Sequence, residues 1–183
     1  MYLHPNSHID HSALLTECGN RTAALADQVA MQGAGHAEYG RLSGAMCWDS
    51  MLICACLAQG VNCQELQSAC DSGRISISPA IMDSDNYDRV FDLETRDVTS
   101  VNDLLNAVTP GSFIGFVRPN NQLGHAMIYI GDGFGAGNKN DCVFSNGSII
   151  GWERLDLRDF FGVDAQSNAG TRMVARPVEG QVF

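Results

Sequence analysis

Hydrophobic residues recur at the spacing of a helix through the first third of the chain. Between residues 12 and 32, Ala, Leu and Val return every three to four positions, which predicts a helix, although Gly19 weakens its middle. Small residues then break the pattern, and we expect a glycine-rich loop over residues 33–46. Residues 47–58 are apolar on almost every side, which predicts a central, buried helix that ends at Gly60.

The second half of the chain changes to the shorter period of strands. We predict short helices at 63–70, 101–108 and 155–161 and strands at 112–117, 125–130, 142–145 and 172–176. Turns are expected at 119–121 and 131–133. We also expect an acidic surface segment at 83–98 and a glycine- and asparagine-rich loop from 134 to about 140. Helices come first and an antiparallel sheet follows. This order is typical of an α+β domain in which N-terminal helices, including the buried central one, pack on the sheet.

Length and composition narrow the class of protein. With 183 residues, 45% of them apolar and 17% charged, the chain fits one globular domain over 1–183, with residues 1–11 flexible. The net charge of -10 opposes binding to nucleic acid and to anionic membranes. No apolar run approaches the roughly 18 residues of a membrane helix. The N-terminus shows no Sec signal pattern, although export by another machinery would leave no such mark.

The seven cysteines suggest reduced thiols rather than a disulfide framework. Their number is odd, Cys54 and Cys56 lie in the apolar helix, and no CxxC spacing indicates a zinc or redox site. His4, His8 and His11 have the spacing of one helix face and could bind a metal, but Pro5 argues against a helix there. We therefore expect neither a metal nor an organic cofactor.

Two residues in this pattern could carry out nucleophilic chemistry. Cys47 begins the central helix, where free backbone N–H groups and the helix dipole favour a thiolate; the alternative is a buried structural cysteine. His125 is the one histidine beyond residue 36, and it opens an apolar strand. Its pKa range suits a base for a thiol, and the alternative is a hydrogen-bonded structural histidine.

A base also needs a partner that orients its ring. If the strand returning beside His125 runs through 142–146, Asn146 comes back next to the imidazole, and Asp141 at the start of that strand is a second candidate. Asp132 lies in the turn at the far end of the His125 strand and is less suitable.

These motifs resemble the papain-like cysteine hydrolase superfamily. Gly44-Ala45-Met46-Cys47-Trp48 is similar to the nucleophile turn of papain-type proteases, and the order of His125, Gly133, Asn146 and Gly151-Trp152 is similar to the later part of those enzymes. Pro110-Gly111-Ser112 followed by the segment 124–133, GHAMIYIGDG, resembles the NlpC/P60 cell-wall amidases. The resemblance covers about a third of the chain. It implies a papain-like fold and a triad of Cys47, His125 and Asn146 or Asp141.

The chain departs from the family pattern at the oxyanion site. Papain-type enzymes carry a Gln six residues before the nucleophile, and this chain has Arg41 there. Tyr39 and Ser43 are the nearest polar alternatives, so the side-chain oxyanion donor stays open. Ser112 also stands where NlpC/P60 enzymes usually have an Asp.

The resemblance implies a cysteine amide hydrolase. The expected activity is that of a bacterial toxin or effector amidase that cleaves peptide bonds of peptidoglycan, with a peptide or protein as substrate and a cognate immunity or chaperone protein as a further partner. Such a protein is expected to be made in the bacterial cytoplasm and exported without a Sec signal peptide into a target cell. A secreted effector protease or glutamine deamidase acting on a host protein is the alternative, since deamidation uses the same acyl chemistry. A non-catalytic binding or inhibitor protein on the same fold is the alternative from another class.

Overall fold

A computed structural model provides the structure of the protein. It describes residues 11–45, 47–60, 96–121, 123–138, 151–162 and 170–176, without the side chains of residues 11–16 and 48. Within these ranges the chain is a mixed helix and antiparallel-sheet structure, which confirms the α+β class. No helix in the described ranges is long and apolar enough to cross a bilayer.

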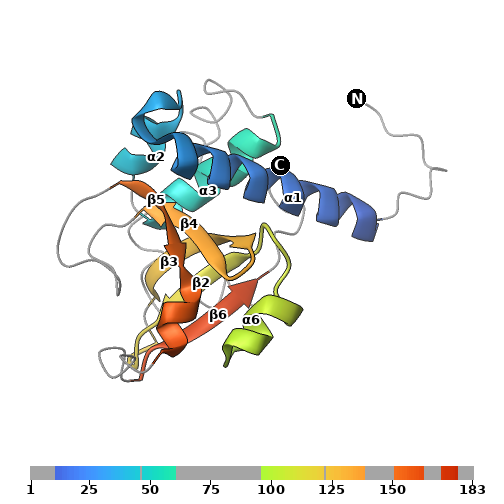
Figure 1. Cartoon of the computed structure of the whole chain (residues 1–183), viewed down its shortest axis with the longest axis vertical. Coiled ribbons are helices and arrows are strands. Elements are labelled where there is room, and N and C mark those ends of the chain that lie inside the picture. The colour runs from blue at the N-terminus through green and yellow to red at the C-terminus, as the bar shows by residue number, and fades with distance from the viewer. Residues whose placement is uncertain are drawn as a thin grey trace.

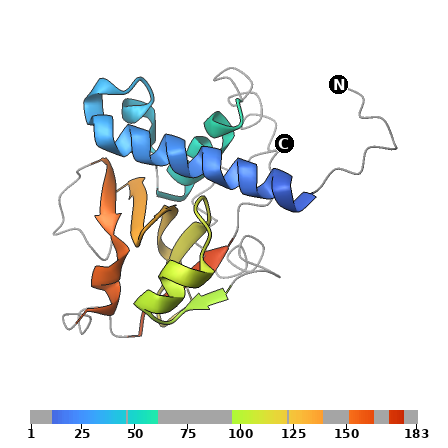
Figure 2. The ribbon, with the colours of Figure 1, turned by 45° about the vertical axis from the view of Figure 1, so that its right-hand side comes forward.

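One antiparallel sheet separates two groups of helices (Figure 1). The helices above it are α1 (His11–Gln32), α2 (Tyr39–Gly44) and α3 (Cys47–Ala58), with the 3-10 turn η1 (Gly33–Gly35) between the first two. Below it lie α6 (Val101–Ala107) and the 3-10 turn η3 (Leu157–Phe161), as the turned view in Figure 2 also shows. The strands follow the order β1-β6-β2-β3-β4-β5 across the sheet: β1 (Arg96–Val98), β2 (Phe113–Val117), β3 (Leu123–Gly131), β4 (Phe134–Asn138), β5 (Trp152–Asp156) and β6 (Arg172–Arg176).

Both faces of the sheet carry an apolar core. The helix-face core joins α1, α2 and α3 to the sheet and includes Ala26, Met51, Phe113, Val117, Ala126, Ile128 and Trp152. The far-face core joins α6 and η3 to the opposite side and includes Leu104, Ile114, Phe116, Met127, Tyr129 and Phe160. Because β2 is covered on both faces, all five of its residues are buried, and its sequence shows a continuous apolar run instead of an alternation.

A β-bulge interrupts the pairing of β3 with β2. Gly115 pairs with Ala126 and Phe116 with His125, but the next pair joins Val117 to Leu123, so Gly124 is an extra residue. An extra residue changes which face the following side chains occupy. Leu123 therefore belongs to the helix-face core although its number is odd, whereas the odd-numbered Met127 and Tyr129 belong to the far-face core.

Glycine allows α1 to cross the loop before β2 at close range. A Cβ added to Gly111 would lie 2.2 Å from the carbonyl oxygen of Gly19, and Gly111 has a φ of 89° that favours glycine. A Cβ added to Gly19 would lie 2.9 Å from the carbonyl oxygen of Pro110. The glycine that weakens the α1 sequence thus permits a backbone-to-backbone contact between α1 and the sheet.

Several predicted elements are confirmed. The long first helix, the buried helix 47–58, the short helix near 101–108 and the strands near 112–117, 125–130 and 172–176 all correspond to described elements. The predicted helix 63–70 and strand 142–145 lie outside the described residues, as does the acidic segment up to residue 95.

Four other predictions are wrong. The segment 33–46 contains α2, which buries Leu42, and is not simply a loop. The loop predicted from 134 is β4, which pairs on both sides; its glycines leave room for the side chains of neighbouring strands, since a Cβ on Gly137 would lie 3.1 Å from Met127. Residues 96–98 form β1 instead of a solvated segment. The predicted helix 155–161 begins as β5 and is helical only in η3.

Candidate active site

Cys47 begins α3 and is buried, with 8% of its surface exposed. The turn before it is held by α3 itself, because the Ser50 hydroxyl donates to the Leu42 carbonyl at 2.7 Å and lies 3.2 Å from the Ala45 carbonyl. Asp49 in the same first turn is also buried, and this burial raises the pKa of its carboxyl. The predicted position of the thiol at the start of a buried helix is confirmed.

Asn138, the last residue of β4, contacts the same turn from the sheet. Its amide nitrogen lies 3.0 Å from the carbonyl oxygens of Leu42 and Ser43, and 2.5 Å from that of Ala45. The residue is completely buried, and its Oδ1 has no hydrogen-bond partner within the described part of the chain. Sequence reasoning missed Asn138 because glycines surround it. The available signal was its place at the end of the alternation Phe134, Ala136, Asn138.

His125 lies on β3 and faces the far-face core. It pairs with Phe116 and stacks on that ring, with 6.0 Å between the ring centroids and an interplanar angle of 23°. The imidazole is completely buried, and neither ring nitrogen has a hydrogen-bond partner among the residues that the structure describes. Burial lowers the pKa of His125 to about 4, so the imidazole is neutral at pH 7.

The structure does not bring the side chains of Cys47 and His125 together. The thiol belongs to α3 on the helix face, and the imidazole lies on the far face with Phe116. The two residues nevertheless share one end of the sheet. Ile128 of β3 pairs with Ala136 of β4. Extended by two residues, this register places Ala126 beside Asn138, and Asn138 contacts the turn before Cys47. His125 is therefore one strand position from the residue beside Asn138, and its side chain lies on the opposite face of the sheet from Cys47.

The strand that follows β3 in the chain and pairs with it is β4, where the sequence predicted a loop, and the predicted strand through 142–146 lies outside the described residues. Asp141 and Asn146 lie outside the described residues, and their assignment stays a prediction. Asp132 lies in the turn at the opposite end of β3, with a φ of 51° and an exposed side chain.

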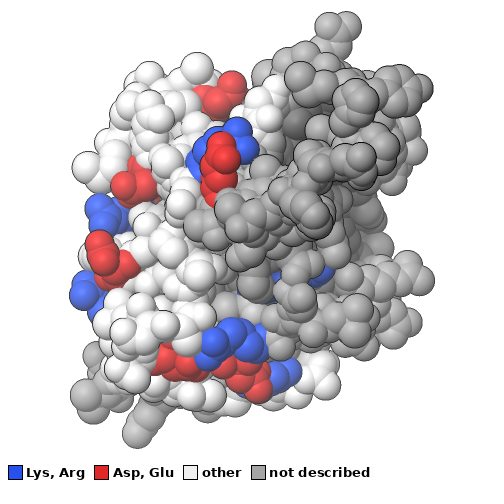
Figure 3. Space-filling view, turned by 90° about the vertical axis from the view of Figure 1, so that its right-hand side faces the viewer, with Lys and Arg blue, Asp and Glu red and all other residues white. Residues whose placement is uncertain are grey.

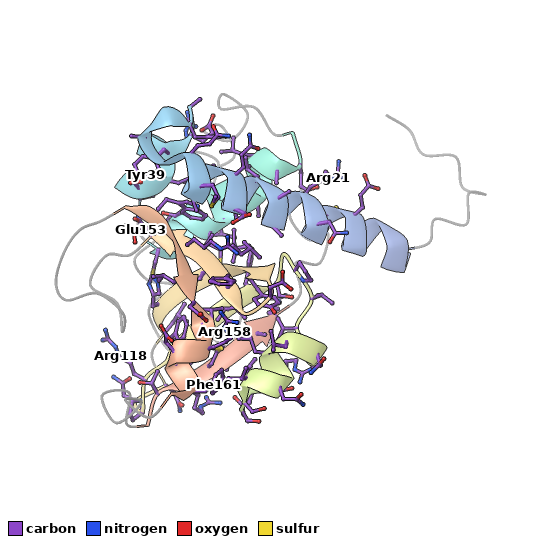
Figure 4. The ribbon with its side chains drawn as sticks, viewed as in Figure 1. Arg21, Tyr39, Arg118, Glu153, Arg158 and Phe161 are labelled. Atoms are coloured by element: carbon purple, nitrogen blue, oxygen red, sulfur yellow. The ribbon has the colours of Figure 1, made fainter. Side chains whose placement is uncertain are left out.

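The polar residues considered for the oxyanion site have other contacts. The Ser43 hydroxyl accepts a hydrogen bond from the Trp152 backbone N–H at 2.9 Å, which ties α2 to β5. A Cβ on Gly151 would lie 2.7 Å from Ser43 Oγ and 2.8 Å from the Tyr39 hydroxyl. Figure 4 shows Tyr39 on α2 near the start of β5, which carries Glu153. Arg41 is exposed and pairs with Glu38 at 3.2 Å.

Other thiols and histidines of the described chain do not form a second site. Burial, together with the nearby Cys56, raises the pKa of Cys54 far above its ordinary value, so this thiol stays protonated. Within the ranges given above, no group of three His, Cys, Asp or Glu residues could hold a metal ion. His4 and His8, and the side chain of His11, lie outside those ranges.

Several of the described charged side chains form ion pairs at the surface. On the face shown in Figure 3, basic and acidic side chains lie next to one another. Arg172 and Asp97 form an ion pair at 2.7 Å between β6 and β1, and Arg96 pairs with Asp103. This face therefore presents no patch of a single sign within the described part of the chain.

No protein-family model, curated protein or solved structure matches this chain. Membership in the papain-like superfamily therefore stays a prediction from the sequence motifs.

Proposed function

We propose that this protein is a papain-like cysteine amide hydrolase in which Cys47 is the nucleophile and His125 the base. The observation that carries the proposal is the His125 imidazole, which is completely buried and has no hydrogen-bond partner for either ring nitrogen among the described residues. An unpaired buried polar group costs about 1–3 kcal/mol. Such a group in a native protein calls for an explanation, and a role in catalysis provides one.

The catalytic form requires His125 on the helix face. His125 reaches that face if the extra residue of the β-bulge changes from Gly124 to Ala126. In that register Phe116 pairs with Gly124 and Gly115 with His125, while the pairing from Met127 onward stays as described. Gly115 has no side chain, so it leaves room for the imidazole. The ring then lies beside Asn138, whose Oδ1 lacks a partner and can accept a hydrogen bond from it.

The reaction follows from these roles. The imidazole of His125 takes the thiol proton as Cys47 Sγ attacks the amide carbonyl carbon, which gives a tetrahedral oxyanion. His125 then returns the proton to the leaving nitrogen as the C–N bond breaks, and a thioester to Cys47 remains. Water, deprotonated by His125, attacks the thioester and releases the acid and the thiol. The backbone N–H at the start of α3 provides an oxyanion donor that needs no side chain.

The substrate we propose is a peptide bond of bacterial peptidoglycan. The motif GHAMIYIGDG at 124–133, which resembles the NlpC/P60 amidases, supports this choice. The protein then acts as a toxin or effector in a target cell, with an immunity or chaperone protein as a further partner. Proteolysis or glutamine deamidation of a host protein uses the same thioester chemistry and is a second possible outcome of the test below.

A non-catalytic binding or inhibitor protein on the same fold is a second candidate. The specific observation in its favour is the location of Cys47 and His125 on opposite faces of the sheet. In that case His125 is a neutral core residue, and Cys47 only fills space at the start of α3.

The test compares wild type with Cys47→Ala and His125→Leu on purified peptidoglycan and on a host-cell lysate, with products identified by mass spectrometry. Cys54→Ala is the matched control, because it removes a buried thiol from the same helix. We expect muropeptide cleavage by wild type and Cys54→Ala, no cleavage by Cys47→Ala, and a rate lower by about 10²–10⁴-fold for His125→Leu.

The outcomes separate the candidates. A shift of about 1 Da on a host protein, lost in Cys47→Ala, assigns deamidation instead. Equal activity of Cys47→Ala and wild type, or no product from either substrate, contradicts the hydrolase and favours the binding protein.

A further inference from the structure

We propose that Asn138 is a positioning residue for the nucleophile, because its amide group holds the backbone turn that presents Cys47. The inference rests on the proposed function in that it assigns Cys47 a reactive thiol. Three carbonyl oxygens of the turn, from Leu42, Ser43 and Ala45, lie within 3.0 Å of the amide nitrogen of Asn138.

Asn138 is fixed on its own side of the contact. It ends β4 in register with Trp152 of β5. The Trp152 backbone N–H donates to Ser43 Oγ, and its indole N–H donates to the Ala26 carbonyl of α1 at 3.0 Å. The sheet edge, α1 and the nucleophile turn are therefore linked through two adjacent residues. Because Asn138 is completely buried and held by these contacts, its amide group can fix the position of the end of α2 and of Ala45.

The electrostatic consequence concerns the thiol. Carbonyl oxygens carry partial negative charge and disfavour a nearby thiolate, whereas the free N–H groups of a helix start favour one. Asn138 on β4 and the Ser50 hydroxyl on α3 both lie within hydrogen-bond distance of the carbonyl oxygens of Leu42 and Ala45, which precede Cys47 in the chain. Removing either donor leaves these oxygens with fewer hydrogen bonds and more of their partial negative charge, and we expect this to raise the pKa of the Cys47 thiol.

Asn138→Asp tests this directly, because it keeps the shape of the side chain and replaces the N–H donor by an acceptor. Asn106→Asp is the matched control. Asn106 is an exposed amide on α6 that donates to the Asn102 carbonyl, far from the turn in the fold. Ser50→Ala is a second variant, and it removes the other donor to the Leu42 carbonyl with a smaller change.

The readout is the rate of Cys47 alkylation by iodoacetamide as a function of pH, followed by peptide mass spectrometry on the full chain. In wild type and Asn106→Asp we expect the midpoint below the ordinary thiol value of about 8.5. In Asn138→Asp and Ser50→Ala we expect it higher by about one pH unit, and the rate at pH 7 lower by about tenfold. Thermal melting checks that each variant is folded.

The result that overturns the inference is a folded Asn138→Asp or Ser50→Ala with the wild-type midpoint. If Asn138→Asp does not fold, Ser50→Ala alone decides. Failure of the proposed function is recognised separately, as unchanged hydrolysis in Cys47→Ala, because the alkylation midpoint does not depend on a substrate.

Discussion

At the scale of single residues, His125 is a completely buried side chain whose two polar atoms both lack a hydrogen-bond partner among the described residues. Its ring is packed against Phe116 in an apolar layer. A leucine of similar size would lose no hydrogen bond there and would avoid the desolvation of the imidazole. The residue therefore costs stability, and we interpret that cost as the consequence of a catalytic role.

The buried His125 imidazole should make the stability of the protein depend on pH. The folded pKa of His125, about 4, lies below the ordinary value of about 6.5, so the unfolded chain binds a proton that the folded chain does not. Its contribution to stability is therefore constant above pH 6.5 and falls as the pH drops from 6.5 toward 4. Between pH 6.5 and 5, wild type should lose about 1–2 kcal/mol that His125→Leu retains.

Urea unfolding at pH 7.5, 6.5 and 5 measures this difference. At pH 7.5, His125→Leu should also be as stable as wild type or more stable by about 1 kcal/mol, although it loses the proposed activity. The same loss of stability with pH in both proteins would show that the imidazole is solvated or hydrogen bonded.

The chemistry at this scale could be predicted only in part. Cys47 is found from the sequence because a helix start next to an apolar run is visible in the residues. The face of His125 is not, because β3 is buried on both sides and its apolar run carries no alternation. The face on which its side chain lies depends on the β-bulge at Gly124, and this bulge arises from the pairing of β3 with β2. Asn138 was missed because the glycines of β4 suggested a loop.

At the scale of elements, close contacts between backbones determine how α1 sits on the sheet. The helix itself was predictable from its period, but the role of Gly19 was not, because a glycine within a helix indicates weakness until its neighbour is known. The neighbour is Gly111, in the loop before β2. A second feature beyond sequence reasoning is β1, whose three residues pair only with the distant β6.

The close contact between Gly19 and Gly111 predicts that alanine substitutions at Gly111 and at Gly40 change the stability of the protein differently. Gly111→Ala combines a positive φ with a Cβ 2.2 Å from the Gly19 carbonyl, so it should destabilise the protein by about 3 kcal/mol or more. Gly40→Ala on α2 meets no atom within 4 Å and should stabilise the protein by up to about 1 kcal/mol. Urea unfolding of both variants provides the measurement. Equal stability of the two would mean that α1 does not cross this loop closely.

At the scale of the whole molecule, one sheet separates a layer of helices from a second, smaller layer. The α+β class was predictable because helices precede strands in the chain, and the structure confirms it. The candidate nucleophile Cys47 is on one side of the sheet and the candidate base His125 on the other, at the same end. A hydrolase with these residues requires β3 to change register near its start, and a binding protein does not.

The central claim is that residue 125 can reach the helix face beside Cys47. The most direct test is to place a thiol there with His125→Cys, oxidise the protein mildly and map disulfides by mass spectrometry. Met127→Cys is the matched control, because its side chain stays in the far-face core in either register. We expect a disulfide between Cys47 and position 125, and none between Cys47 and position 127. A folded His125→Cys protein with no such disulfide, even after prolonged oxidation, would contradict the proposed active site.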